Sequence, residues 1–302
     1  MKIFIHPHTN NNFQVKWCCP RTELIIQEGL SKIPEVELVD SELQADFVIL
    51  HHVPQNHGQK SFDLINKINP KKLIVVDSID EQNEYFVEEF NPNNYFLYFK
   101  RSIVDVDPPT GNRTKRKLPE RCFGWDYAIL NEFIQPIKNK NIDIGCYLRP
   151  SCVWRNVVLN WMHSFHYPNK KIGAVSSGSR SYGLDVYFDS QYFEHLAKTK
   201  ILVHASPFGW YGCSRTWEAL ANQCCLISNE FYDTLPNPLV PDEHYLKFNP
   251  VSRYDLYDKI FEVIYNENKL KEIAEKGHAY ALNYHTAEAR VKYILEKIEE
   301  NS

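Results

Sequence analysis

The chain has 302 residues, a formal net charge of −4, and 43 % hydrophobic against 24 % charged residues. This length suits two domains of ordinary size, and the composition excludes a disordered chain. The small negative charge gives no reason to expect nucleic acid or an anionic membrane as a partner. The N-terminal sequence lacks the apolar core of a signal peptide, and no apolar run reaches the roughly 18 residues of a membrane span. We therefore expect a cytoplasmic protein with no transmembrane segment.

Cysteine usage agrees with a reducing compartment. The chain contains no CxxC pair, and several of its cysteines stand in apolar, strand-like runs. A disulfide framework belongs to secreted proteins, so we expect mostly buried, free thiols. The eight cysteines are Cys18, Cys19, Cys122, Cys146, Cys152, Cys213, Cys224 and Cys225.

The first part of the chain alternates between strand-like and helix-like segments. Apolar runs bounded by polar residues predict buried strands, and apolar residues at helical spacing predict the helices between them. The strands are expected over 2–6, 36–40, 45–53, 71–80 and 95–102, and the helices over 21–33 and 61–69. Such alternation favours a parallel sheet with helices on both faces.

Residues 105–121 interrupt this alternation with three prolines and five basic residues, which predicts a loop before a second domain. The alternation then resumes. Further strands are expected over 142–148, 170–176, 201–206, 224–229 and 244–248, and helices over 151–165, 189–200, 214–223 and three segments near the end. We predict an α/β protein of two doubly wound, Rossmann-like domains facing a cleft, with ligands at the carboxyl ends of the strands. The expected domains are 1–130 and 131–285, and the closing helix, 286–302, is expected to return to the first.

The segment HASPFGWYGCSRTWEALANQCCLIS, residues 204–228, links a predicted strand, a glycine-rich turn, a helix and another strand. Gly209 and Gly212 allow a ligand to approach the backbone closely. The free N–H groups at the start of the following helix form an anion site.

Three polar side chains follow this turn. Ser214 can cap the helix or bond a phosphate oxygen, and Arg215 offers a fork of donors suited to a diphosphate. Glu218 lies on the same helical face and can accept hydrogen bonds from a ribose diol. The alternative is an ordinary capped helix with a surface Arg–Glu pair.

The stretch FGWYGCSRTWEALANQCCLIS, followed by LPNPLVPDEHYLKF, resembles the donor-binding segment of GT-B glycosyltransferases, most closely the exostosin-like (family 47-type) group. The match covers about residues 189–300. The resemblance implies a nucleotide-sugar donor, expected to be a UDP-sugar, in the C-terminal domain and a glycan acceptor in the N-terminal one. Carried over, Ser214 and Arg215 hold the diphosphate and Glu218 the ribose. Ser206, Gly209 and Gly212 are placed in the same donor site.

One departure from the family pattern bears on the reaction. Many retaining GT-B enzymes carry a glutamate eight positions before the ribose-binding one, and here that position is Trp210. We therefore expect an inverting transfer that needs no metal and no cofactor besides the donor. Arg149, directly after the predicted strand 142–148, is a further candidate for the donor phosphates, although a plain surface arginine is an equal alternative.

An inverting transfer needs a base beside the acceptor hydroxyl. Asp77 ends a predicted buried strand and His8 lies in the Asn-rich loop after the first strand, so these two are the candidates; His6, His51, His52 and Asp80 are weaker ones. Lys100 and Arg101 end another strand and could offset the donor's negative charge across the cleft. The alternatives are a carboxylate that caps a helix and a solvated loop histidine.

The sequence also permits other functions. Asp105 and Asp107 form an Asp-x-Asp that could hold a divalent metal, but the surrounding prolines and basic residues favour a loop. The absence of GxGxxG and of GxxxxGK[ST] weakens a dehydrogenase and a P-loop enzyme. The rivals are a non-catalytic nucleotide- or sugar-binding protein on the same scaffold and a nucleotide-sugar epimerase.

Overall fold

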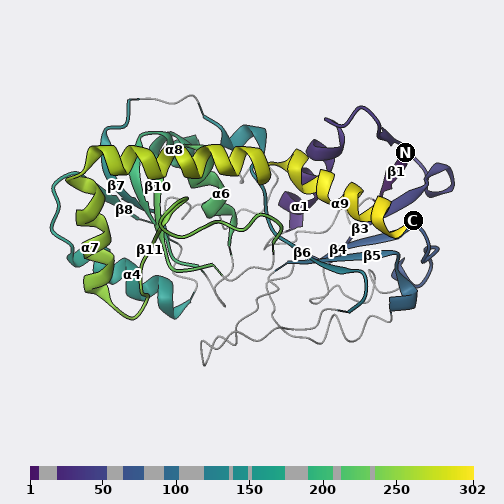
Figure 1. Ribbon diagram of the computed structural model, residues 1–302, viewed down its shortest axis with the longest axis horizontal. Helices are drawn as coiled ribbons and strands as arrows, with labels where there is room; N and C mark the ends of the chain where they lie inside the picture. Colours follow the sequence, from purple (N-terminus) through teal and green to yellow (C-terminus); the bar gives the residue numbers. More distant parts are fainter. Residues whose placement is uncertain are drawn as a thin grey trace. The chain divides into compact units, whose positions relative to one another are not determined.

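The computed structural model describes ten stretches of the chain (Figure 1). They are residues 1–6, 19–52, 64–77, 92–101, 119–135, 139–148, 152–173, 190–206, 212–231 and 235–302. The chain divides into two compact units. The N-terminal unit comprises Met1–Ala128, Asp233–Pro236 and Ala287–Ser302, and the C-terminal unit comprises Ile129–Tyr232 and Asn237–Thr286.

The N-terminal unit is built on a six-stranded parallel sheet. Its strands have the order β2-β1-β3-β4-β5-β6. Their bounds are β1 Lys2–Ile5, β2 Glu37–Leu38, β3 Phe47–His52, β4 Leu73–Asp77, β5 Leu97–Arg101 and β6 Cys122–Trp125. The helices are α1 Cys19–Leu30 and α9 Ala287–Asn301, with short 3-10 turns η1 Glu42–Gln44 and η2 Pro92–Asn94. The predicted parallel sheet is confirmed, and β6 is a strand that the sequence pattern did not predict.

Helix α9, at the end of the chain, packs on α1 and on the sheet of the N-terminal unit (Figure 1). Gly29 of α1 lies so close to it that a Cβ would collide with Ala287 O and Val291 Cγ2. The ring of Tyr293 lies 5.8 Å from that of Phe99, centre to centre, in an edge-on contact. The glycine and the aromatic contacts thus fix the last helix against strands from the first part of the sequence.

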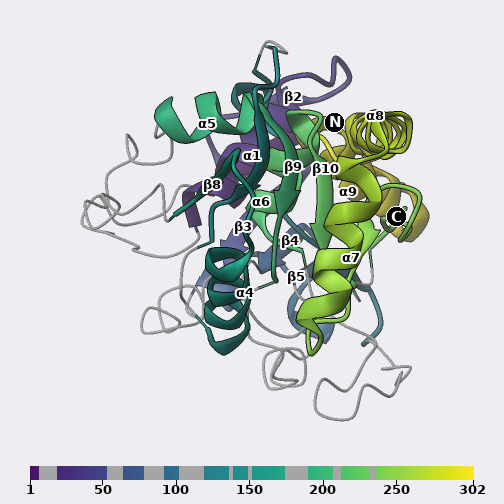
Figure 2. The same cartoon turned by 90° about the vertical axis from the view of Figure 1, so that its left-hand side faces the viewer.

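The C-terminal unit has a five-stranded parallel sheet in the order β11-β10-β9-β7-β8 (Figure 2). The strands are β7 Ile142–Cys146, β8 Lys170–Ile172, β9 Thr199–Val203, β10 Cys225–Ser228 and β11 Leu246–Lys247. The helices are α4 Val153–Ser164, α5 Ser190–Ala197, α6 Ser214–Ala221, α7 Arg253–Ile264 and α8 Glu267–Tyr284, with the 3-10 turn η3 Asn131–Phe133.

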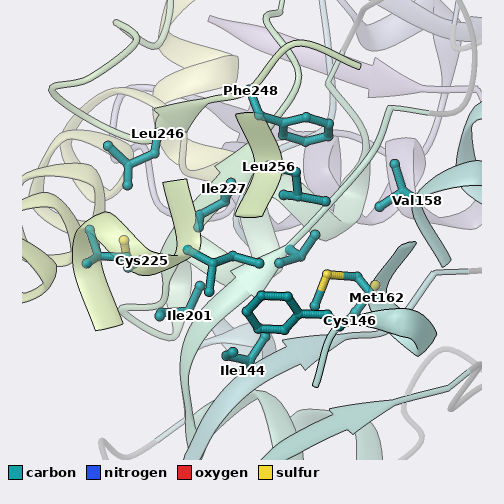
Figure 3. Packing of buried hydrophobic residues seen from close by; sticks show 14 of the residues in the cluster. Ile144, Cys146, Val158, Met162, Ile201, Cys225, Ile227, Leu246, Phe248 and Leu256 are labelled. Carbon is teal, nitrogen blue, oxygen red and sulfur yellow. The ribbon is translucent and has the colours of Figure 1, made fainter. Parts of the chain in front are cut away.

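Strand alternation divides the core of this unit between two faces. Ile201 and Val203 of β9 join an apolar cluster with residues of α4, α7 and α8 (Figure 3). Leu202, between them, points to the opposite face. Helices α5 and α6 contact β9 and β10 there. The β9–α6 connection therefore leaves one end of a sheet whose two faces are both covered.

The six cysteines whose side chains are described are free thiols, and five of them are buried, as their apolar surroundings predicted. Burial raises the pKa of the Cys146 thiol to about 12, so it stays neutral. Within the described residues, no helix combines the length and apolar character needed to cross a bilayer.

Candidate functional site

The connection from β9 to α6 brings the predicted polar residues of the C-terminal unit to the carboxyl end of its sheet. Strand β9 ends at Val203, and α6 begins at Ser214. Cys213 is the N-cap of α6: its side chain accepts from the Thr216 backbone, and its own N–H donates to Thr216 Oγ1 at 3.4 Å. The prediction that Ser214 caps the helix is therefore wrong by one position, because the sulfur and the threonine hydroxyl already fill the cap.

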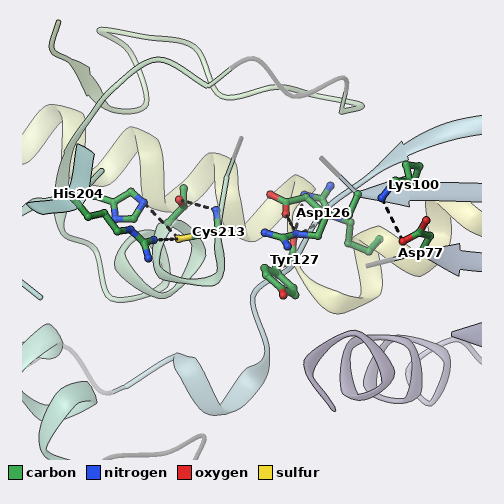
Figure 4. A network of polar contacts seen from close by, with 10 residues as sticks. Asp77, Lys100, Asp126, Tyr127, His204 and Cys213 are labelled. Carbon is green, nitrogen blue, oxygen red and sulfur yellow. Dashed lines mark hydrogen bonds and ion pairs between the residues drawn. The ribbon is translucent and has the colours of Figure 1, made fainter. Parts of the chain in front are cut away.

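A buried polar cluster holds the start of α6 against the end of β9 (Figure 4). Cys213 Sγ lies 3.4 Å from His204 Nε2 and 3.6 Å from Arg155 Nη2. Arg155 Nε also donates to the carbonyl of Ala205 at 3.0 Å. Burial, with the nearby charges of Arg155 and Arg215, lowers the pKa of His204 well below its usual range. The imidazole is therefore neutral in the folded protein.

Glu218 is held from the neighbouring helix. Tyr192 of α5 donates its hydroxyl hydrogen to Glu218 Oε2 at 2.7 Å, and Glu218 is only 2 % exposed. The Arg215 guanidinium carbon lies 5.8 Å from the centre of the Tyr192 ring. Burial, and next the negative charge of Glu218, raise the pKa of Tyr192 well above its usual range, so its hydroxyl stays protonated. Arg215, Glu218 and Tyr192 thus form one charged cluster between α5 and the first half of α6.

Several buried polar atoms around this turn have no hydrogen-bond partner within the described part of the chain. They are Ser206 Oγ, Arg215 Nε and His204 Nδ1. The backbone of Ser206, by contrast, is fixed because its N–H donates to Asn229 Oδ1 at 2.8 Å. A buried polar group without a partner costs free energy, which a polar ligand can recover. Ser206 and Arg215 are therefore suited to binding such a ligand.

The structure describes only some of the remaining predicted donor residues. Gly212 is buried immediately before the N-cap of α6. Gly209 and Arg149 lie outside the described residues, as does Trp210. Of the predicted set, the described residues of the β9–α6 connection and of α6 thus include Ser206, Gly212, Ser214, Arg215 and Glu218.

In the N-terminal unit, Asp77 lies at the end of β4 and is completely buried. Its Oδ1 is 3.3 Å from Lys100 Nζ, and Tyr98 donates to its Oδ2 at 2.6 Å (Figure 4). Burial, and next the charge of Asp77, raise the pKa of Tyr98 well above its usual range. Asp77 is therefore a carboxylate already bound by a cation and a hydroxyl, and His8 lies outside the described residues.

Arg101 points to the opposite face of β5 from Lys100 and is 1 % exposed. Its Nε donates to Asp126 Oδ1 at 3.1 Å, and its guanidinium carbon lies 3.9 Å from the centre of the Tyr127 ring. The carbonyl of Tyr127 also accepts from Arg290 of α9. Arg101 thus helps to anchor the segment that follows β6. No local sequence pattern predicted its contacts with Asp126 and Tyr127.

Sequence reasoning missed Tyr192, Arg155 and His204 as members of the cluster around α6. Tyr192 and Arg155 stand in the predicted helices 189–200 and 151–165, but nothing at their own positions indicated a polar partner. Their partners are 26 and 50 or more residues away in sequence. His204 was missed although it directly follows β9, where the rule that ligands bind beyond strand ends could have drawn attention to it.

No group of three or more histidine, cysteine, aspartate or glutamate side chains is arranged to hold a metal ion within the described residues. Asp105 and Asp107, the Asp-x-Asp of the sequence, lie outside those residues.

A family model described as glycosyl transferase-like matches residues 129–296, which is more than half of the chain. No curated protein sequence matches.

Solved structures with similar folds are glycosyltransferases. An α-glucosyltransferase in complex with UDP-glucose and DNA has a TM-score of 0.64 at 11 % identity, covering 99 % of this chain and 98 % of that one. A glycosyltransferase from Rickettsia africae has a TM-score of 0.62 at 10 % identity, with coverages of 99 % and 98 %. TarM has a TM-score of 0.53 at 13 % identity and covers 83 % of this chain, which spans about half (54 %) of TarM. The two parallel sheets and these likenesses establish the predicted GT-B fold.

The buried ion pair between Asp77 and Lys100 gives a test of stability. Asp77→Asn removes the carboxylate charge beside a buried ammonium, and we expect the free energy of unfolding to fall by about 3 kcal/mol. In the double variant Asp77→Asn/Lys100→Met, at least half of that loss should return, because the buried cation is gone too. Urea denaturation of Asp77→Asn, Lys100→Met, the double variant and the wild type measures this. Additive effects of the two substitutions would contradict a coupled pair.

The neutral, buried His204 predicts a pH dependence. Unfolded chains bind a proton at this histidine below about pH 6.5, whereas the folded protein does not until a lower pH. Above about pH 6.5 this histidine therefore does not lower the free energy of unfolding. Below that pH, proton binding by the unfolded chain lowers the free energy of unfolding by up to about 1.4 kcal/mol per pH unit.

The measurement is urea denaturation between pH 7 and pH 5. We expect the wild type to lose about 1–2 kcal/mol more than His204→Gln over this range. The exposed His166→Gln is the matched control and should follow the wild type. Equal losses in His204→Gln and the wild type would contradict the buried neutral imidazole.

Proposed function

The chain belongs to the glycosyl transferase-like family, and on that premise we propose that it transfers a sugar from a nucleotide diphosphate donor, a UDP-sugar, to a hydroxyl group of a glycan. One observation carries the donor site. Arg215 Nε and Ser206 Oγ are buried and lack hydrogen-bond partners among the described residues, beside the N-terminus of an eight-residue helix that follows a parallel strand. A diphosphate is the ligand that these groups fit best.

In the proposed donor site, each of a few residues binds a different part of the donor. The N–H groups at the start of α6, with Ser214 and Arg215, bind the diphosphate, and Gly212 lets the backbone approach it. Glu218 accepts hydrogen bonds from the ribose hydroxyls. The same positive groups stabilise the negative charge that grows on the departing nucleotide as the glycosidic bond breaks. In this proposal Arg149, Ser206 and Gly209 complete the set.

A uridine donor has support from the structural neighbours. An α-glucosyltransferase is described as a complex with UDP-glucose or with UDP, and a TarM complex contains UDP together with α-GlcNAc-glycerol. Some α-glucosyltransferase complexes also contain DNA. We do not extend that partner to this chain, whose net charge of −4 offers no general attraction to a polyanion.

The acceptor side of the proposal lies in the N-terminal unit. Asp77 and His8 are the proposed bases that deprotonate the acceptor hydroxyl, and Lys100 and Arg101 are proposed to offset negative charge. In this proposal the transfer is inverting, requires no metal and is of the exostosin-like type, since Trp210 stands where many retaining enzymes have a glutamate. The Lys100 contact to Asp77 orients the carboxylate, and a proton taken up there would weaken that ion pair.

Nucleotide binding tests the donor site. Calorimetry with UDP, GDP, CDP and UMP, each with and without Mg²⁺, should show binding of UDP without metal. Arg215→Ala and Glu218→Ala should each weaken UDP binding by about tenfold or more, because each removes a charge-assisted hydrogen bond. Arg253→Ala is the matched control, since Arg253 is an exposed arginine of α7 whose side chain bonds Tyr254.

The outcomes separate the proposed transferase from its rivals. If no nucleotide binds, or binding ignores both substitutions, the β9–α6 turn is only a capped helix and the proposal fails. With a UDP-sugar and a glycan acceptor, a transferase releases UDP and forms a new glycoside. A binding protein forms no product, and an epimerase changes the donor with no acceptor present. Proton NMR of the product gives the anomeric outcome, and retention would reject the inverting mechanism.

A further inference from the structure

We propose that Tyr192 of α5 is a positioning residue of the donor site, which orients the Glu218 carboxylate toward the ribose hydroxyls and so sets the preference for ribonucleotides. The inference rests on the proposed function, because it adds a residue to that same donor site. Tyr192 makes no contact with substrate in this proposal and acts only through Glu218.

The contact between the two side chains is short and buried. Tyr192 OH lies 2.7 Å from Glu218 Oε2, and the two residues are 9 % and 2 % exposed. A hydrogen bond to a carboxylate is roughly twice as strong as one between neutral groups, and burial strengthens it further. Glutamate has three rotatable side-chain bonds, so a fixed bond to one oxygen restricts where the other oxygen can point.

The tyrosine ring is itself held in place. It meets the ring of Tyr147 edge-on, with 5.9 Å between centres, and it lies 5.1 Å from the ring of Phe193. Tyr147 is fixed in turn by its hydroxyl, which lies 3.0 Å from Thr199 Oγ1 of β9. The orientation of Glu218 therefore depends on a chain of packed rings that begins at the sheet.

The same ring lies beside the cation of the site. The guanidinium carbon of Arg215 is 5.8 Å from the centre of the Tyr192 ring, within the range of a cation–π contact. Tyr192 thus adjoins both residues that the proposed function assigns to the donor. Because its pKa is raised by burial and by Glu218, its hydroxyl remains a donor throughout the neutral range.

A purely structural role explains this arrangement less well. A buried carboxylate is expensive in free energy, and a pair of apolar side chains of similar size is often as stable or more so. The Tyr192–Glu218 pair joins α5 to α6 one turn beyond the first residue of the helix at whose start the donor is proposed to bind, rather than at an arbitrary point of the core. A site that recognises a diol needs an oriented acceptor, and this pair provides one.

The probes are UDP and 2′-deoxy-UDP, whose dissociation constants are measured by calorimetry. The wild type should prefer UDP by about tenfold or more, because 2′-deoxy-UDP lacks a hydroxyl that a buried carboxylate would bind. Tyr192→Phe keeps the ring and removes only the hydrogen bond. We expect it to reduce this preference at least about threefold, with binding of 2′-deoxy-UDP changed by less than about twofold.

Two further variants make the test specific. Tyr257→Phe removes the hydroxyl of a tyrosine on α7, which donates to the carbonyl of Trp161 at 2.6 Å, and should keep the wild-type preference. In a Glu218→Gln background, Tyr192→Phe should reduce the preference no further, because the tyrosine acts through the carboxylate. If Tyr192→Phe shows no cooperative melting, Tyr192→Leu removes the same donor and replaces it in the series.

The possible results are distinguishable. A wild type that does not bind UDP overturns the proposed function and this inference with it. Loss of binding in Arg215→Ala together with an unchanged ribose preference in Tyr192→Phe overturns the role of Tyr192 alone. Equal weakening of UDP and 2′-deoxy-UDP by Tyr192→Phe also overturns it, since a merely structural change affects both nucleotides alike.

Discussion

A parallel sheet directs the carboxyl ends of all its strands to one edge, and this constraint governs where chemistry can reside in both units. In the C-terminal unit the edge receives the end of β9 and the start of α6, where backbone N–H groups lack helical partners. Cys213, His204 and Arg155 fill the space between strand and helix. Ser206 and Arg215 keep buried polar atoms without described partners. These contacts fix the start of α6 against the end of β9 while leaving groups that can bind an anion.

Both units place a carboxylate, a tyrosine and a cation together near strand ends. In the N-terminal unit, Tyr98 and Lys100 hold Asp77 within the sheet itself. In the C-terminal unit, Tyr192 holds Glu218, with Arg215 beside the ring. In each case burial keeps the tyrosine protonated, so the hydroxyl donates to a fixed carboxylate oxygen. Such pairs are expensive to bury, and the proposed function gives each of them a role in binding or catalysis.

The alternation of apolar runs was sufficient to predict both parallel sheets, because strands buried on both faces read as continuous apolar segments. It failed at β6, whose CFGW stretch is short and follows a basic, proline-rich segment. The cap of α6 was missed because cysteine is an unusual N-cap residue and Ser214 stood next to it. Tyr192 was missed because its partner, Glu218, is 26 residues away. Periodicity reports which residues are buried, and long-range pairs of buried polar groups leave no local pattern.

The central claim is that the β9–α6 turn binds the donor nucleotide, and amide hydrogen exchange with and without UDP tests it most directly. Bound diphosphate should cover the N–H groups at the start of α6. The account predicts slower exchange in peptides covering 204–206 and 212–221, with little change in α7 of the same unit. Unchanged exchange in those peptides, with slowing confined to β4 and β5 of the N-terminal unit, would contradict it.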